Sequence, residues 1–118
     1  MVSHESEREI LTLNGSGLEG VQKQILAGPR DGYRGFLREF TLSPAGHTPF
    51  HSHSWTHLIY VLGGSGRLSS EGREHALRQG SVVFIAGGKE HGIANTGRAP
   101  LRFLCLVPEE GDEYLPGP

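Results

Sequence analysis

Short apolar runs separated by glycine-rich turns recur along the chain from about residue 36 to residue 107. Within the runs, apolar and polar positions alternate with a period of two or stay continuously apolar, as they do in β-strands. No stretch shows the 3.6-residue period of an amphipathic helix. We expect about nine or ten short strands in a β-sandwich or barrel. The clearest expected strands are residues 36–42, 57–62, 67–70, 73–77, 81–85, 91–95 and 101–107.

The two ends and one internal loop are expected to lie outside these strands. Residues 1–9 are charged and predict a loose arm, within an N-terminal region 1–20 that precedes a barrel over 21–108. Leu11 and Leu13 would begin an edge strand in that region. Two prolines and a glycine in 43–49 predict a loop there. Residues 109–118 are acidic and proline-rich and predict a C-terminal tail.

Size and charge exclude several classes of function. The 118 residues correspond to one domain. The net charge is −2 and no run of basic residues occurs, so nucleic acid is not an expected partner. No apolar run approaches the ~20 residues of a membrane span, and the polar N-terminus does not resemble a signal peptide. The single cysteine, Cys105, cannot form an internal disulfide. We therefore expect a cytoplasmic protein without a membrane segment.

Three histidines, His51, His53 and His57, fall within seven positions. On a strand the first two point to the same face, and a bend before His57 would let it complete a set of three. Neutral imidazole binds Zn, Cu, Fe, Ni and Mn. A neighbouring antiparallel strand could bring His91 to the same point. The two other histidines outside the arm, His47 and His75, are expected on the surface.

The histidine-rich stretch resembles the first motif of the cupin superfamily, with Gly46, His51, His53, His57 in the place of the usual glutamate, and Gly64. Residues 80–95 resemble the second motif, with Gly80, Ala86 in the place of proline, Gly88, His91 and Asn95. The resemblance covers roughly residues 35–107 and is strongest to small single-domain bacterial cupins. It implies an all-β, single-domain jelly-roll barrel.

The resemblance also implies that His51, His53, His57 and His91 hold one divalent transition metal: Mn, Fe, Ni, Cu or Zn. Histidine in the glutamate place removes the one anionic ligand, so four neutral imidazoles leave the metal charge uncompensated. Such a site should favour a small anionic ligand. Six-coordinate metals would keep two positions open for substrate or dioxygen.

Six residues are candidates for the wall of the ligand pocket: Arg38, Phe40, Trp55, Ile59, Phe103 and Cys105. Arg38 shares a strand face with phenylalanines, and it would either lay its stem on an edge with its head in water or point inward to an anionic ligand. Cys105 is either a small core residue or a thiol near the metal. Trp55 is either a lid or a dimer anchor. Phe36, Phe40 and Phe84 are expected in the core.

Partners that fix the histidine tautomers are expected among Ser52, Ser54, Thr56 and Asn95, although Asn95 could instead cap a turn. No general acid or base can be named, because Glu90 is the only carboxylate in the cluster and is expected to face water. This argues against simple hydrolysis.

Three functions remain: a metal-dependent enzyme of dioxygenase type acting on a small anionic or oxygenated molecule, a non-catalytic binding or sensing protein, and a sugar-type isomerase or epimerase. Exposed sheet edges also predict a homodimer that pairs through an N-terminal or edge strand.

Overall fold

The computed structural model describes residues 1–112, and its regular structure is almost entirely antiparallel β-sheet. Within these residues the only helical segments are 3-10 turns at Glu5–Glu7, Pro29–Asp31 and Glu109–Gly111, so none is long enough to cross a bilayer. The strands are β1 (Leu11–Leu13), β2 (Glu19–Ala27), β3 (Phe36–His47), β4 (His57–Gly63), β5 (Ser65–Ser70), β6 (Arg73–Arg78), β7 (Val82–Ile85), β8 (His91–Asn95) and β9 (Leu101–Val107).

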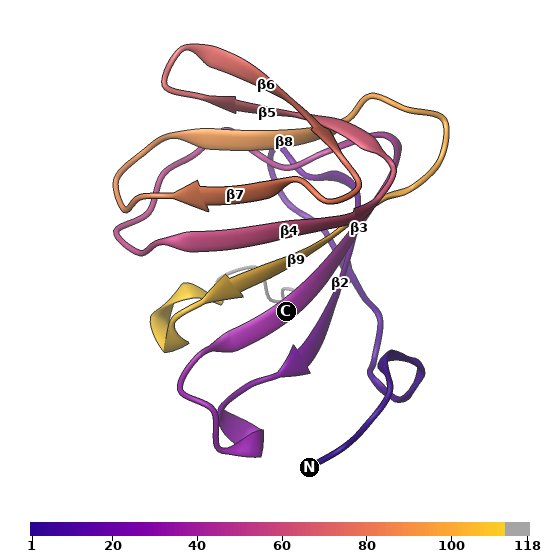
Figure 1. Ribbon diagram of the computed structural model, residues 1–118, viewed down its shortest axis with the longest axis vertical. Helices are drawn as coiled ribbons and strands as arrows, with labels where there is room; N and C mark the ends of the chain where they lie inside the picture. The colour runs from indigo at the N-terminus through magenta and orange to yellow at the C-terminus, as the bar shows by residue number, and fades with distance from the viewer. Residues whose placement is uncertain (113–118) are drawn as a thin grey trace.

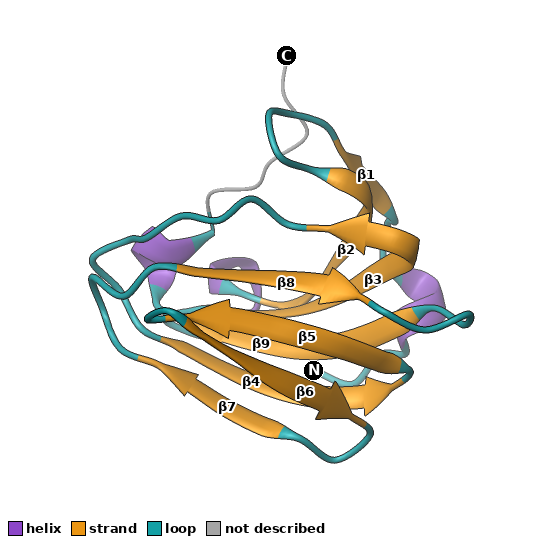
Figure 2. Ribbon diagram, turned by 90° about the horizontal axis from the view of Figure 1, so that it is seen from above, coloured by secondary structure: helices purple, strands orange, loops and turns teal. Residues whose placement is uncertain are grey.

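The sheet curls into a barrel with two walls. The path of paired strands runs β6-β5-β8-β3-β9-β4-β7 (Figure 1). Off this path, β2 pairs with β3, and β1 pairs with β2. The long strand β3 joins the walls, because its residues 36–42 pair with β9 whereas His47 pairs with Ala94 of β8. Figure 2 shows β5, β6 and β8 facing the wall of β9, β4 and β7. The prediction of an all-β jelly-roll barrel is confirmed.

Side chains of alternate residues fill the space between the walls. On β4, Ile59 and Val61 are buried and Tyr60 is exposed, as the period of two requires. Phe40 of β3 stacks on Phe103 of β9 at a centroid distance of 5.4 Å. The buried apolar core consists of Leu13, Val21, Phe40, Leu42, Ile59, Val61, Leu68, Leu77, Ile85, Ile93, Leu101, Phe103, Cys105 and Val107.

The prediction of a loop over residues 43–49 is wrong for residues 43–47, because β3 continues through Pro44 as far as His47. The strand tolerates proline there because its pairing with β2 is irregular: the register shifts between Glu19 and Val21. Ala45 has a φ of 66° at this bulge. The irregularity lets the end of β3 bend toward β8, and this bend carries the following residues to the site.

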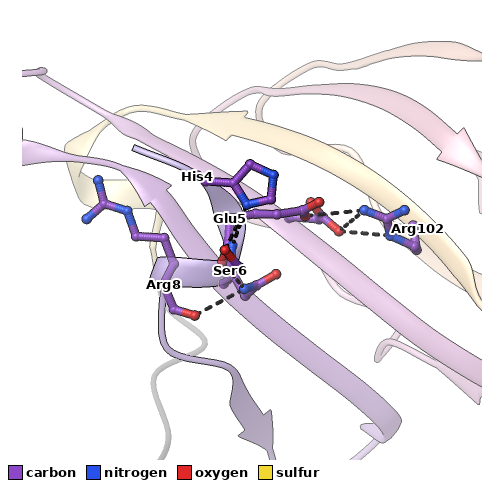
Figure 3. Close-up of polar contacts among 7 residues, drawn as sticks. His4, Glu5, Ser6, Arg8 and Arg102 are labelled. Atoms are coloured by element: carbon purple, nitrogen blue, oxygen red, sulfur yellow. Dashed lines mark hydrogen bonds and ion pairs between the residues drawn. The ribbon is translucent and has the colours of Figure 1, made fainter. Parts of the chain in front are cut away.

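The N-terminal arm is more ordered than the sequence predicted. Strand β1 pairs with β2, and Leu13 is buried. The Gln24 amide donates to the carbonyl oxygens of Glu5 and Arg8 at 2.9 and 3.1 Å. Figure 3 shows Glu5 beside Arg102 of β9, whose Nη2 donates to the Glu5 carboxylate at 3.3 Å. Polar contacts therefore hold the arm against the outside of the barrel.

Phe84 is not in the core. It lies on β7, at the end of the strand path, and 63% of its surface is exposed. Ile85 fills the inward position of this short strand instead. The expectation is confirmed for Phe40, which is buried, and for Phe36, which packs against the core.

Asn95 has the turn-capping role. Its side-chain nitrogen donates to the carbonyl oxygens of Leu42 and Ala99 at 2.9 and 2.8 Å, and its side-chain oxygen accepts from the Gly97 amide at 2.8 Å. These bonds tie the end of β8 to β3 and fix the turn that leads into β9.

Candidate metal centre

Backbone pairing between His51 and His91 brings the two histidine stretches together. His51 follows β3 and forms an isolated antiparallel bridge with His91, the first residue of β8. The His51 amide donates to the His91 carbonyl at 3.0 Å, and the His91 amide donates to the His51 carbonyl at 2.8 Å. The two imidazole rings lie 5.1 Å apart between centroids.

Three of the four predicted ligands lie close enough together that they could hold one metal ion. One ring nitrogen from each of His51, His53 and His91 lies within 4.8 Å of the others. The His57 ring is close, with its centroid 4.8 Å from that of His53 and 4.9 Å from that of His91. His57 begins β4 and is only 6% exposed. Its role as a fourth ligand remains a prediction.

Two of the rings have outer hydrogen-bond partners that the sequence did not indicate. The Nδ1 atom of His91 lies 2.9 Å from the carbonyl oxygen of Lys89, and Nδ1 of His57 lies 3.2 Å from the sulfur of Cys105. The expected Ser and Thr hydroxyls do not fill these two positions. The period of two along β9 was the available signal, since it placed Cys105 inside the barrel.

The donor set fits a transition metal. Burial lowers the pKa of His57 to about 3 and that of His51 to about 4, with added repulsion from neighbouring histidines. The pKa of His53 is also lowered, by burial and by Arg38. These rings are therefore neutral at pH 7, as metal binding requires. The Nε2 atom of His57 is buried without a hydrogen-bond partner among the described residues, which suits a nitrogen that awaits a metal.

A cavity of about 30 Å³ opens beside the histidines. A single water needs about 10–15 Å³, so the space admits roughly two small groups. Most of the lining surface is apolar, and none of the described residues contributes a carboxylate to it. The lining residues are Arg38, Phe40, Thr48, His51, His57, Ile59, His91, Ile93, Phe103 and Cys105.

The lining includes five of the six predicted pocket residues, with Trp55 as the exception. The sequence analysis did not single out Thr48 or Ile93. Their positions depend on the irregular end of β3, where the Thr48 amide donates to the Ile93 carbonyl at 2.9 Å.

Arg38 points into the barrel and is only 1% exposed, so the alternative of an edge arginine with its head in water is wrong. Its Nη1 donates to the Asp112 carboxylate at 3.4 Å and its Nη2 to the Cys105 sulfur at 3.1 Å. The guanidinium also lies 4.9 Å from the centre of the Phe40 ring. Lys23, fully buried on β2, contacts the same Asp112 oxygen at 2.8 Å. The sequence did not reveal that Asp112 of the expected tail belongs to this cluster.

Cys105 is a buried core residue, which was one of the two alternatives that the sequence left open. Its sulfur also contacts His57 of the histidine cluster. Burial raises the pKa of its thiol, although the nearby Arg38 acts in the opposite direction. The sulfur therefore keeps its proton at pH 7.

Trp55 stacks on the ring of His53, with centroids 4.6 Å apart and an angle of 12° between the planes. It packs against the core from outside the cavity lining. A Cβ on Gly111 would lie 2.9 Å from the indole, so Trp55 fills the space between His53 and the C-terminal 3-10 turn.

The metal-free protein should lose stability as the pH falls from 6.5 to 4.5. The unfolded chain protonates its histidines near their ordinary pKa of about 6.5, whereas His51 and His57 stay neutral in the fold. The unfolded state thus binds more protons between pH 6.5 and 4.5. Each of these histidines lowers the free energy of unfolding by up to about 1.4 kcal/mol for every pH unit of acidification. Urea unfolding in the presence of a chelator measures this slope. In His57→Leu, the free energy of unfolding should depend less steeply on pH. A wild-type free energy of unfolding that does not change with pH would contradict the conclusion that these rings are buried and neutral.

Comparison with known proteins is consistent with this geometry. The cupin domain family matches residues 38–107. The chain is 31% identical over 67 residues to an oxalate-binding protein from Thermotoga maritima, a match that covers 56% of this chain and about half (55%) of that protein.

Two solved structures share the fold over 92% of this chain. The polyketide cyclase RemF from Streptomyces resistomycificus is 32% identical, with a TM-score of 0.86 and 79% of its chain covered. A predicted oxalate decarboxylase from Thermotoga maritima is 27% identical, with a TM-score of 0.81 and 98% of its chain covered. The family match spans more than half of the sequence and includes all four histidines of the cluster, so this chain belongs to the cupin family.

Proposed function

We propose that this protein binds one divalent transition metal through His51, His53 and His91, with His57 as fourth ligand, and uses it to bind and activate a small anionic oxygen ligand. The observation that carries the proposal is the meeting of three histidine nitrogens within 4.8 Å beside a cavity. When bound, the metal would act as a Lewis acid and as a template for the ligand.

The charges around the cavity favour an anion. The rings of His51, His53 and His57 are neutral because burial lowers their pKa values. The described lining residues include no carboxylate, and the buried Arg38 adds a positive charge. Arg38 shares Asp112 with Lys23, so this carboxylate serves two cations. A carboxylate or enolate between the metal and Arg38 would balance the remaining charge. The small volume of the cavity limits the ligand to a few heavy atoms inside the barrel.

The remaining lining residues would exclude water. Phe40, Ile59, Ile93 and Phe103 surround the cavity with apolar surface, which strengthens electrostatic interactions between the ligand and the charged groups. Because the lining residues that the structure describes offer no carboxylate base, the chemistry would depend on the metal and on the ligand itself. This favours dioxygenase-type or enolate chemistry over hydrolysis.

The names of the relatives support the ligand class. One is an oxalate-binding protein and one a predicted oxalate decarboxylase, which suggests a small carboxylate. Another is a polyketide cyclase, which suggests an enolisable carbonyl compound. Since one of these names denotes binding alone, a non-catalytic binding protein is the second candidate function.

Replacing His53 with alanine should release the metal and lower the melting temperature, because bound metal stabilises only the folded state. At a free metal concentration 100 times Kd, the loss would be about 2.7 kcal/mol. Elemental analysis and thermal melting after metal loading measure the two effects. His75→Ala, at an exposed position on β6, is the matched control and should keep the metal. An unchanged metal content in His53→Ala would contradict the assignment.

The metal-loaded protein should bind oxalate, and Arg38→Met should weaken this binding by roughly 10–100-fold, the usual effect of losing a hydrogen bond to a charged group. Calorimetry with oxalate measures the affinity, and thermal melting confirms that the variant is folded. Oxygen uptake with small keto, enol and diol compounds then separates the two candidate functions. Turnover supports the dioxygenase-type enzyme, whereas ligand binding without turnover of any compound supports the binding protein.

We also propose a homodimer that buries an outer apolar face of the barrel. This face consists of Leu58, Tyr60, Val82, Phe84, Leu104 and Leu106, which are neighbours in the register of β7, β4 and β9. Val82 and Phe84 are 75% and 63% exposed, and Leu58 and Tyr60 are 48% and 47% exposed. Contiguous exposed apolar surface commonly marks an interface.

A second copy of the chain suits this face because none of its six residues is charged, so two copies related by a two-fold axis can pack apolar surface on apolar surface. A standard interface buries ~800 Å² per partner, and large aromatic side chains bury roughly 150–250 Å² each. Tyr60 and Phe84 would therefore supply a substantial part of it.

Phe84→Glu should convert the dimer to a monomer, because it would bury a charge within the apolar contact. Sedimentation velocity at micromolar concentrations measures the change. Ile10→Glu is the control, since Ile10 is 59% exposed but lies on the N-terminal arm. If Phe84→Glu stays dimeric while Ile10→Glu dissociates, the interface involves the arm and this proposal is wrong. A monomeric wild-type protein would refute the homodimer altogether.

A further inference from the structure

The sulfur of Cys105 lies between two buried nitrogen groups. It is 3.1 Å from Nη2 of Arg38 and 3.2 Å from Nδ1 of His57. All three residues are at least nine-tenths buried, with exposures of 1% for Arg38, 3% for Cys105 and 6% for His57. A sulfur that only filled space in the core would not need two polar neighbours.

The proton positions in this trio are restricted. A guanidinium can only donate, so the sulfur accepts the hydrogen bond from Arg38. Toward His57 the sulfur could either donate its S–H to Nδ1 or accept an N–H from it. If the sulfur donated, the ring proton would sit on Nε2, and this buried N–H would have no acceptor among the described residues.

If the sulfur instead accepts from Nδ1–H, the donor left unpaired is the thiol S–H, which is a much weaker donor than a ring N–H. Nε2 then carries a lone pair and no proton. The same arrangement occurs at His91, where Nδ1 lies 2.9 Å from the Lys89 carbonyl oxygen. A carbonyl can only accept, so Nδ1 of His91 must donate and its Nε2 is left unprotonated. His57 and His91, from distant strands, would then both have Nδ1 held by an acceptor, as histidine ligands of metals generally do.

We propose that Cys105 is the positioning residue of the metal centre: its sulfur holds His57 in the tautomer whose unprotonated Nε2 can serve as the fourth ligand. This inference rests on the proposed function, because it assigns the role of His57 within that metal site. Arg38 supports the arrangement from the other side of the sulfur, where it occupies an acceptor position and fixes the side chain.

Two substitutions separate a positioning role of Cys105 from a role in filling the core, because the two roles predict opposite orders of tolerance. Cys105→Val keeps an apolar side chain of similar size but removes the acceptor. Cys105→Ser keeps an acceptor but introduces a buried hydroxyl. A core-filling cysteine would tolerate valine better than serine. A positioning cysteine would be replaced better by serine than by valine.

Metal affinity and histidine tautomer are the quantities to measure. Competition with a chelator gives the affinity for Co²⁺, whose visible spectrum also reports the number and geometry of its ligands. Long-range ¹H–¹⁵N correlation spectra of the metal-free protein give the tautomer of His57 directly. Leu101→Val is the matched control, because Leu101 is buried on the same face of β9 but does not line the cavity.

We expect Cys105→Val to bind Co²⁺ 10–100-fold more weakly, with an altered spectrum, and Cys105→Ser and Leu101→Val to stay within about threefold of the wild type. In the metal-free wild type, Nδ1 of His57 should carry the proton. Unchanged affinity and spectrum in Cys105→Val, or a proton on Nε2, would overturn the role of Cys105 while leaving the metal centre intact. A wild-type protein that binds no metal would overturn both.

Discussion

The candidate site depends on the pairing of His51 with His91. Their two backbone hydrogen bonds join a segment that follows β3 to the first residue of β8, forty positions later in the chain. The pairing is reached only because β3 bends at its irregular end, where Pro44 and Ala45 interrupt regular pairing with β2. Backbone geometry, rather than attraction between the rings, therefore brings the imidazoles together. Uncharged rings can be held this closely because burial lowers their pKa values and so avoids repulsion between imidazolium ions.

Charge is distributed unusually around this centre. The position that usually provides a glutamate holds His57, so none of the four predicted ligands carries a negative charge. The Asp112 carboxylate, at the end of the described residues, contacts Lys23 and Arg38 instead. Such buried cations are costly unless they are paired, so the segment after β9 contributes to the interior of the barrel rather than only to its surface. The need for a further anion near the metal follows from this distribution.

Much of the fold could be predicted from sequence because it depends on local signals. Alternation and turn residues located β4 to β9 closely, and motif spacing identified the histidines. Proline content gave the wrong prediction at Pro44, because a strand tolerates proline at a bulge, and the bulge lies in β3 itself, between Leu42 and His47. Phe84 was misplaced because apolarity does not tell the inner face of an edge strand from the outer one. Asp112 and the Lys89 carbonyl were missed because their contacts arise from loops, which leave no period in the sequence.

Strands β4 and β9 carry apolar side chains on both faces, although Arg102 also lies on the outer face of β9. The barrel core explains only the inward ones. Inward residues such as Ile59 and Phe103 are buried in the core. The outward residues Leu58 and Tyr60 would gain nothing from facing water, since an antiparallel sheet with one wet face normally alternates apolar and polar side chains. Two-sided apolar strands are typical of sheets covered on both sides. The same alternation along β4 that points His57 toward the cavity points Leu58 toward the outer face. A second copy of the chain packed on that face would therefore contact the strand that carries His57, on the side opposite the cavity.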